Sequence, residues 1–187
     1  MSKIEQLQRE LNLIHDDTLR TIVTDFLNIR VPDYFYVVPA SSIGKYHPQI
    51  SLGQGGLVRH TKMAVEIANS MFELSMWTPI LDKKDMIVAS LIIHDTFKLG
   101  EPQQIYTIHD HPIVASEVFK KFAKTYTYPQ EKVDEICGCV ACHMGQWSRN
   151  KHSDIVLPTP KDPVQKFVHL CDFISSKKFI GNLDYIE

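Results

Sequence analysis

The chain has 187 residues, 44% of them hydrophobic, and a formal net charge of -2. A chain of this length can bury a full core, and its slightly acidic balance excludes a global basic field that would recruit nucleic acid. No apolar run approaches the roughly 18 residues of a membrane span, and the polar N-terminus lacks a signal-peptide core. We therefore expect a cytoplasmic protein that has no membrane partner and whose four cysteines are reduced thiols.

The apolar periodicity predicts helices along most of the chain. They are expected at residues 3–30 (with a break near 15–17), 57–76, 83–97, 112–125, 129–144 and 163–179. Asp16 or Asp17 would cap the second half of the first helix, and Asp82 would cap the helix at 83–97. Pro112 is well placed in a first helical turn. Only Tyr34–Val38 resembles a strand, so the predicted fold class is all-α.

Two long loops interrupt these helices. Residues 31–57 contain three prolines and four glycines, and residues 145–160 contain two further prolines. Loops of such length are uncommon in a compact domain unless they serve a function. The first carries Lys45 and His47 shortly before a candidate ligand, and we expect both to contact substrate. The second carries Trp147, which would stack on a nucleobase or serve as a core or lid residue.

Histidines and carboxylates recur at helix ends and inside apolar helix faces. They are His60, His94, Asp95, His111, His143 and Asp172. Because bundle cores build metal sites from ligands on facing helices, this set predicts a metal centre. Four imidazoles and two carboxylates exceed the needs of one tetrahedral ion and suit two ions that share a carboxylate. Asp95 is the expected bridge, since its neighbour His94 points about 100° around the helix.

Several of these residues stand in segments that resemble a known family. The segment Gly55–Thr61, GGLVRHT, is similar to the GGL-x-x-H-T opening of the HD superfamily of metal-dependent phosphohydrolases. The segment Leu91–Lys98, LIIHDTFK, resembles its L-x-x-H-D-x-x-K motif, and the helix around Asp172 resembles its closing helix. The matching segments cover about residues 40–180.

The remaining histidines resemble one branch of that superfamily. His111 with Pro112, and then His143, match the two additional histidines of the bimetallic branch. No GYP motif follows His143, so cyclic di-GMP hydrolysis is not implied. The resemblance implies one HD-domain helical bundle over residues 1–187, with residues 1–30 as a helical extension and a long N-terminal loop over the metal site.

The resemblance also implies a ligand set and a chemistry. One ion would be held by His60, His94, Asp95 and Asp172, and the other by His111, His143 and the shared Asp95. The ions would be divalent transition metals (Fe, Mn, Co, Ni or Zn), and they would turn a shared water into a nucleophile that attacks phosphorus.

Lys98 lies one helical turn after Asp95. It would hold a phosphoryl oxygen as a point charge and act as a catalytic residue beside Asp95. The alternative is a solvent-exposed Asp95–Lys98 pair. The implied enzyme hydrolyses a phosphomonoester or phosphodiester, either of a nucleotide or at a nucleic-acid end.

Other interpretations use the same residues. The ligand set also suits a mixed-valent di-iron oxygenase, and a non-catalytic nucleotide-sensing module is a third interpretation. His109 competes with His111 as a ligand and otherwise would reach substrate. His169 is expected to be either a satisfied structural histidine or a residue that supports the ligands from behind. Arg59 and Arg149 are weaker phosphate candidates. The oligomeric state is left open.

Overall fold

The structure is a computed structural model that describes residues 2–180, and this part of the chain is helical. It contains α1 (Gln8–Leu11), α2 (Asp17–Ile29), α3 (Gly56–Met71), α4 (Lys84–Ile93), α5 (His111–Ala123), α6 (Gln130–Cys142) and α7 (Pro163–Ser175). Short 3-10 helices lie at Glu5–Leu7, Asp33–Tyr36, Gln49–Ser51 and Ser75–Lys83. No β-strand occurs between residues 2 and 180, so the predicted all-α class is confirmed for them. The predicted domain of residues 1–187 also includes Met1 and 181–187, which lie outside the described residues.

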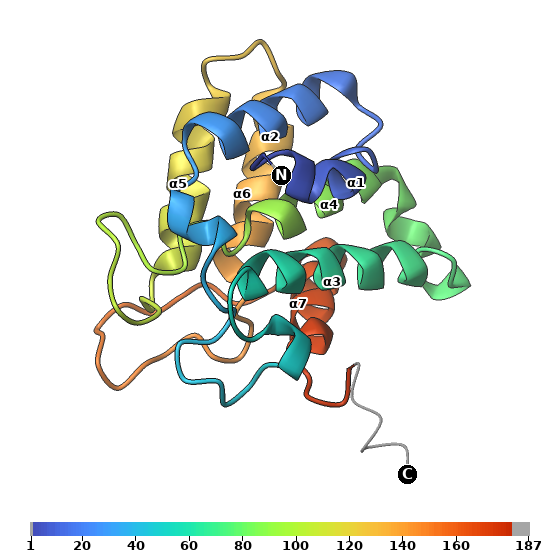
Figure 1. Ribbon diagram of the computed structural model, residues 1–187. Helices are drawn as coiled ribbons and strands as arrows, with labels where there is room; N and C mark the ends of the chain where they lie inside the picture. Colours follow the sequence, from blue (N-terminus) through green and yellow to red (C-terminus); the bar gives the residue numbers. More distant parts are fainter. Residues whose placement is uncertain (1, 181–187) are drawn as a thin grey trace.

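Helix α4 lies at the centre of the molecule. Every residue from Met86 to Ile93 is buried, and α4 packs against α2, α3, α5, α6 and α7. Figure 1 shows α3 running across the front, α5 beside α6, and α7 close to α3. A helix that is apolar on every face requires such neighbours. The end of α4 therefore brings His94 and Asp95 into the interior.

The first predicted helix is divided at the expected place. α1 ends at Leu11 and α2 begins at Asp17. The Asp16 carboxylate accepts hydrogen bonds from the backbone N–H groups of Thr18 (3.1 Å) and Leu19 (3.0 Å). The predicted break and the Asp16 cap are confirmed, because this carboxylate satisfies N–H groups that have no partner inside the helix.

Other boundary predictions are wrong. Asp82 caps no helix, because it lies inside the 3-10 helix Ser75–Lys83 and α4 begins without a side-chain cap. Helix α3 stops at Met71 instead of residue 76, and α7 stops at Ser175 instead of residue 179. The strand candidate Tyr34–Val38 is wrong as well. Residues Asp33–Tyr36 form a 3-10 helix instead, and its three consecutive aromatic rings are all buried.

Helix α4 also stops earlier than predicted, at Ile93 instead of residue 97. The side chains that follow compete for its last carbonyl groups. His94 Nδ1 donates to the Leu91 carbonyl at 2.6 Å, and Thr96 Oγ1 donates to the Ile93 carbonyl at 2.8 Å. Such local bonds replace continued helical pairing.

Three loops gather on one side of the molecule, at the lower left of Figure 1. They connect the Asp33–Tyr36 helix to α3, α4 to α5, and α6 to α7. The Thr107 backbone N–H donates to Ser42 Oγ at 3.3 Å, and His109 Nε2 donates to the Ile155 carbonyl at 3.1 Å. None of the helices within residues 2–180 is long and apolar enough to cross a membrane.

Candidate metal centre

The six predicted ligands come from the ends of four helices and from the turn after α4. His60 lies in the second turn of α3, His111 opens α5, His143 follows α6, and Asp172 lies in the last turn of α7. Helix α3 can start where it does because Gly56 has no side chain: a Cβ there would lie 2.1 Å from the Ser51 carbonyl oxygen. The preceding Gly55 adopts a left-handed φ of 70°. The GG pair thus fixes where His60 enters the core.

Asp95 lies between two pairs of imidazoles. Its Oδ2 atom is 3.5 Å from Nε2 of His60 and 3.5 Å from Nε2 of His94. Its Oδ1 atom is 3.1 Å from Nε2 of His111 and 3.6 Å from Nε2 of His143. Each carboxylate oxygen therefore faces its own pair of nitrogens, and both three-residue groups are compact enough to hold a metal ion.

Asp172 joins the first of these groups. Its Oδ1 atom lies 3.0 Å from Nε2 of His60 and 3.5 Å from Nε2 of His94. Asp172 is partly exposed, whereas the other five predicted ligands are buried. The carboxylate of Asp172 is thus the part of this cluster that reaches toward solvent.

Hydrogen bonds on the far side of each ring set its tautomer. The Nδ1 atoms of His94, His111 and His143 each donate to the carbonyl oxygen three residues earlier, at 2.6, 2.7 and 2.8 Å. A carbonyl can only accept, so each Nδ1 carries a proton and each neutral ring presents a lone pair at Nε2.

His60 reaches the same state through a side chain. The Ser175 hydroxyl donates to the Asp172 carbonyl at 2.7 Å, and its oxygen accepts from His60 Nδ1 at 3.1 Å. All four rings therefore direct an unprotonated Nε2 toward the carboxylates. Orientation of ligating imidazoles by hydrogen bonds of this kind is typical of metal centres.

The resulting interior is rich in acceptors. Nε2 of His60 lies 3.3 Å from Nε2 of His94, and Nε2 of His111 lies 3.3 Å from Nε2 of His143. Two facing lone pairs form no hydrogen bond, and Asp95 Oδ1 is buried without a hydrogen-bond partner. Burial of so many acceptors is costly unless a cation compensates them. Imidazole nitrogen and carboxylate oxygen are donors that suit divalent transition metals, so this cluster fits the predicted ions.

The charges of the site follow the same logic. Burial opposes ionisation of Asp95, yet the Lys98 ammonium beside it holds its pKa well below the usual range. Burial lowers the pKa of His60 and of His111. For His94, burial acts in the same direction, but the neighbouring carboxylates outweigh it and raise the pKa. Ionised carboxylates and mostly neutral imidazoles are the forms that bind metal.

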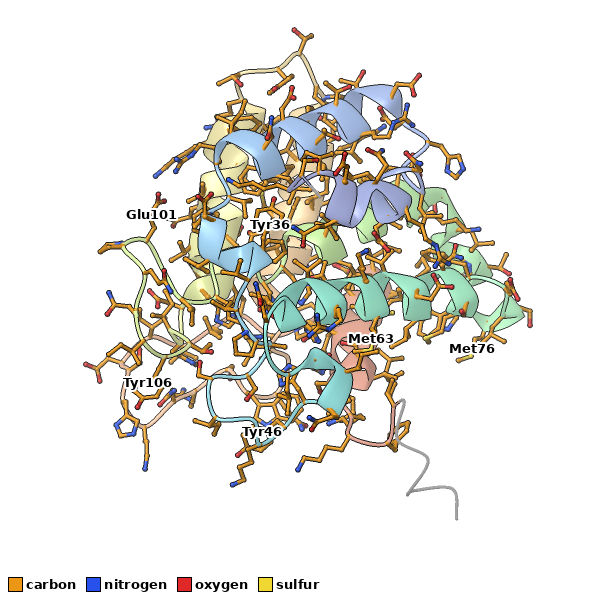
Figure 2. The ribbon with its side chains drawn as sticks, in the orientation of Figure 1. Tyr36, Tyr46, Met63, Met76, Glu101 and Tyr106 are labelled. Carbon is orange, nitrogen blue, oxygen red and sulfur yellow. The ribbon has the colours of Figure 1, made fainter. Side chains whose placement is uncertain are left out.

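A cavity of about 590 Å³ opens above this cluster. Asp95, His111, His143 and Asp172 form part of its lining, and the loops that gather on the lower side of the molecule form its rim. Figure 2 shows Tyr46 and Tyr106 on two of these loops. Volumes of this size are typical of small-molecule sites.

Of the other predicted residues, Lys98 lies closest to the ligands. Its Nζ atom is 2.5 Å from Asp95 Oδ2, and its side chain is only 12% exposed. The pair is therefore buried at the cavity floor, which excludes the alternative of a solvent-exposed pair.

His47 packs edge-on against the His60 ring, with the ring centroids 4.9 Å apart. Its Nδ1 atom is buried without a hydrogen-bond partner. Burial, reinforced by the charge of Lys98, lowers the pKa of His47 to about 3. His47 is thus a neutral ring that lines the cavity beside the first group of ligands.

Of the remaining residues predicted to contact substrate, some line the cavity and others do not. His109 and Trp147 line the cavity, and so does Arg149. Lys45 does not belong to the lining, since its Nζ atom lies over the ring of Tyr46 at 5.3 Å. Arg59 donates hydrogen bonds to the carbonyl groups of residues 50, 52 and 54. These bonds hold the loop before α3, whereas the sequence analysis considered Arg59 as a phosphate contact.

Several residues of the site do not belong to the predicted set. Ser175 lies three residues after Asp172, so helical spacing alone could have suggested that it faces the ligands. Phe173 and Lys177 line the cavity from the same helix end. Gly145, directly after the predicted end of its helix, is a sequence signal for a left-handed turn, but its contact with His169 could not be predicted.

His169 contacts the turn that carries the predicted ligand His143. Its Nδ1 atom donates to the His143 carbonyl at 2.7 Å. The ring passes directly over Gly145, where a Cβ would lie 2.2 Å from its Cε1 atom. Gly145 therefore leaves the space that His169 needs in order to hold the turn carrying His143.

We compared the chain with models of protein families, with curated proteins and with solved structures, and none of them matched.

Proposed function

We propose that the protein is a metal-dependent phosphohydrolase of the HD type. It binds two divalent transition-metal ions and hydrolyses a phosphomonoester or phosphodiester of a nucleotide or a nucleic-acid end. The observation that carries this proposal is the position of Asp95, whose two oxygens each face a separate pair of imidazole nitrogens. Shared carboxylates of this kind are characteristic of two-ion sites.

The ligands divide between the two ions. His60, His94, Asp172 and Asp95 would hold one ion, and His111 and His143 would hold the other together with Asp95. Bound there, such ions would supply an acidified water as the nucleophile and positive charge that offsets the negative phosphoryl oxygens.

Lys98 has two tasks in this proposal. Its ammonium group orients Asp95 through the contact at 2.5 Å. It also lines the cavity, so its remaining N–H donors face the space where a substrate phosphate binds. A compact point charge is suited to that role.

The second candidate is a mixed-valent di-iron oxygenase. The observation in its favour is the ligand set itself, because imidazoles and carboxylates also suit iron. The buried Lys98 favours the first candidate without excluding the second, since an ammonium beside the ligands assists binding of a phosphoryl group.

Metal analysis combined with a substrate screen tests the proposal. We expect about two transition-metal ions per chain in the purified protein, and about one after His60→Ala or His143→Ala. The exposed His152 provides a matched control, since His152→Ala should retain both ions. Absence of bound metal, together with no hydrolysis of mono- or diesters after addition of Mn2+, would contradict the proposal. Oxygen consumption by the reduced iron form would favour the second candidate.

A further inference from the structure

One wall of the cavity is a stack of aromatic rings and a cation. Trp147, in the loop after α6, lies parallel to Phe173 of α7, with the ring centroids 5.5 Å apart and an interplanar angle of 18°. Lys177 Nζ lies 3.3 Å from the centroid of the Phe173 ring and 5.9 Å from that of Trp147. We call these three residues the aromatic wall. Their mutual contacts constrain the position of the indole.

The indole of Trp147 is nevertheless open to solvent. Phe173 covers it on one side, and 45% of the residue remains exposed. An exposed indole that already stacks on Phe173 is suited to stacking on a further planar ring, because the contact with Phe173 reduces the conformational freedom still to be lost.

The charge of the cavity is unlike that of the whole chain. Three cations, Lys98, Arg149 and Lys177, line it. Apart from the predicted ligands Asp95 and Asp172, no carboxylate within residues 2–180 belongs to the lining. Elsewhere on the surface Lys83 and Lys120 pair with Glu135 and Asp134, whereas the two cations of the rim face a lining without such partners.

Lys98 lies on the floor with the metal ligands, whereas Lys177 belongs to the aromatic wall. The cavity therefore has a cation at its floor and another at its wall, and both favour the binding of anionic groups. The ring that stacks on Trp147 would belong to a ligand that carries negative charge beside it.

We infer that the aromatic wall is a binding subsite for the organic part of the substrate. A planar aromatic ring stacks on Trp147, and an anionic group next to that ring interacts with Lys177 and Arg149. The ligand class is a phosphorylated nucleoside, either free or at the end of a nucleic-acid strand. The role of this subsite in catalysis rests on the proposed function, but its binding does not require hydrolysis.

Binding can be measured with the 5′-methylene phosphonate analogue of AMP, which has no ester bond to hydrolyse. Methylphosphonate lacks the ring, and adenosine lacks the anionic group. We expect calorimetry to give the tightest binding for the complete analogue. The inference is overturned if the ring adds nothing to the affinity of methylphosphonate.

Residue variants locate the ring. Trp147→Leu should weaken binding of the analogue about tenfold, the usual strength of base–aromatic stacking, while Trp147→Phe should retain most of it. Lys177→Gln should weaken binding about threefold at low salt and less at high salt. Lys178→Gln removes the same charge from an exposed neighbour outside the lining and serves as the control. Equal affinities of Trp147→Leu and the unchanged protein would disprove the subsite.

Fluorescence provides an independent readout. The chain contains two tryptophans, and Trp77 packs against Phe167 with a centroid distance of 4.7 Å. In Trp77→Phe, Trp147 is the only indole, and the analogue should quench its emission whereas methylphosphonate should not. Competition with a 5′-phosphorylated single-stranded oligonucleotide separates the two sources of the ligand: displacement of the analogue assigns strand ends, and lack of displacement assigns free nucleotides.

Failure of this inference is distinguishable from failure of the proposed function. Hydrolysis of glycerol 2-phosphate, which has no ring, without any ring-dependent binding would leave the phosphohydrolase proposal standing and remove the subsite. Ring-dependent binding without hydrolysis of any phosphoester would do the reverse.

Discussion

The floor and the rim of the cavity are built in opposite ways. The floor consists of buried side chains at helix ends, and three of its histidines are oriented by backbone carbonyls three residues earlier. The rim consists of loops whose large side chains, Tyr46, Tyr106 and Trp147, are exposed. The difference indicates that the floor determines the chemistry, whereas the rim determines which molecule reaches it. Substitutions should therefore separate the two regions.

The largest effect is expected at Asp95. Asp95→Asn keeps the shape of the side chain but removes the charge that both ligand groups share. Metal content should fall well below one ion per chain, and activity should fall more than about a hundredfold. Elemental analysis and initial rates measure the two effects. Retention of both ions would show that the floor does not depend on this carboxylate.

A smaller effect is expected where the floor meets a loop, at Gly145. Gly145→Ala places a Cβ 2.2 Å from the His169 ring at a φ of 59°, so we expect a loss of about 1–3 kcal/mol in the free energy of unfolding. Urea denaturation measures it. Gly138→Ala is the matched control, because its Cβ meets only the end of the Gln165 side chain at 3.3 Å and alanine is favoured in helices. Equal losses for both variants would remove any special role for the turn.

From the pKa values of the buried imidazoles we expect the stability of chelator-treated protein to depend on pH, with an effect of intermediate size. Burial lowers the folded-state pKa of His60 and His111, and that of His47 to about 3. The unfolded chain takes up protons near pH 6.5, so the stability these groups contribute is complete above about pH 6.5 and is lost as the pH falls. His94, whose pKa is raised, acts in the opposite direction.

Urea midpoints should therefore decrease from pH 7 to pH 5. His47→Gln should make this decrease shallower, because it removes one buried neutral imidazole. An unchanged slope in His47→Gln would show that His47 is not shielded from protons in solution.

Much of the floor could be predicted from the sequence, because histidines and carboxylates at the ends of apolar helices are costly to bury unless they bind a cation. His60, His94 and His143 illustrate this, since each stands at or near a helix end in a buried segment. The helix boundaries were less predictable. Asp82 failed as a cap and α4 ended early, because side-chain bonds to carbonyls and 3-10 turns are decided by local competition that periodicity does not capture.

The rim could not be predicted to the same degree. Lys45 and His47 are two residues apart in one loop, yet only His47 turns toward the ligands. Phe173 and Lys177 line the cavity because the loop after α6 lies against α7, and this packing could not be predicted from the sequence. Loop conformation depends on tertiary contacts, for which the sequence gives no periodic signal.

The smallest effect is expected at Lys45. Its ammonium lies outside the lining residues, so Lys45→Gln should change KM by less than about twofold. Lys98→Gln, which removes the same charge from the floor, should lower kcat by a much larger factor than Lys45→Gln changes KM. Steady-state kinetics with one phosphoester compares the two variants. A large increase in KM for Lys45→Gln would extend the rim to this residue.

The hydrogen bonds behind the four rings differ in one respect that bears on mutational robustness. His94, His111 and His143 are oriented by backbone carbonyls, which no substitution at residues 91, 108 or 140 can delete. His60 depends on the hydroxyl group of Ser175 instead. Of the four rings, only His60 can therefore lose the hydrogen bond that sets its tautomer through a substitution of the partner residue. The site most tolerant of neutral drift is the one around Asp95 Oδ1, and the most fragile is the one that includes His60.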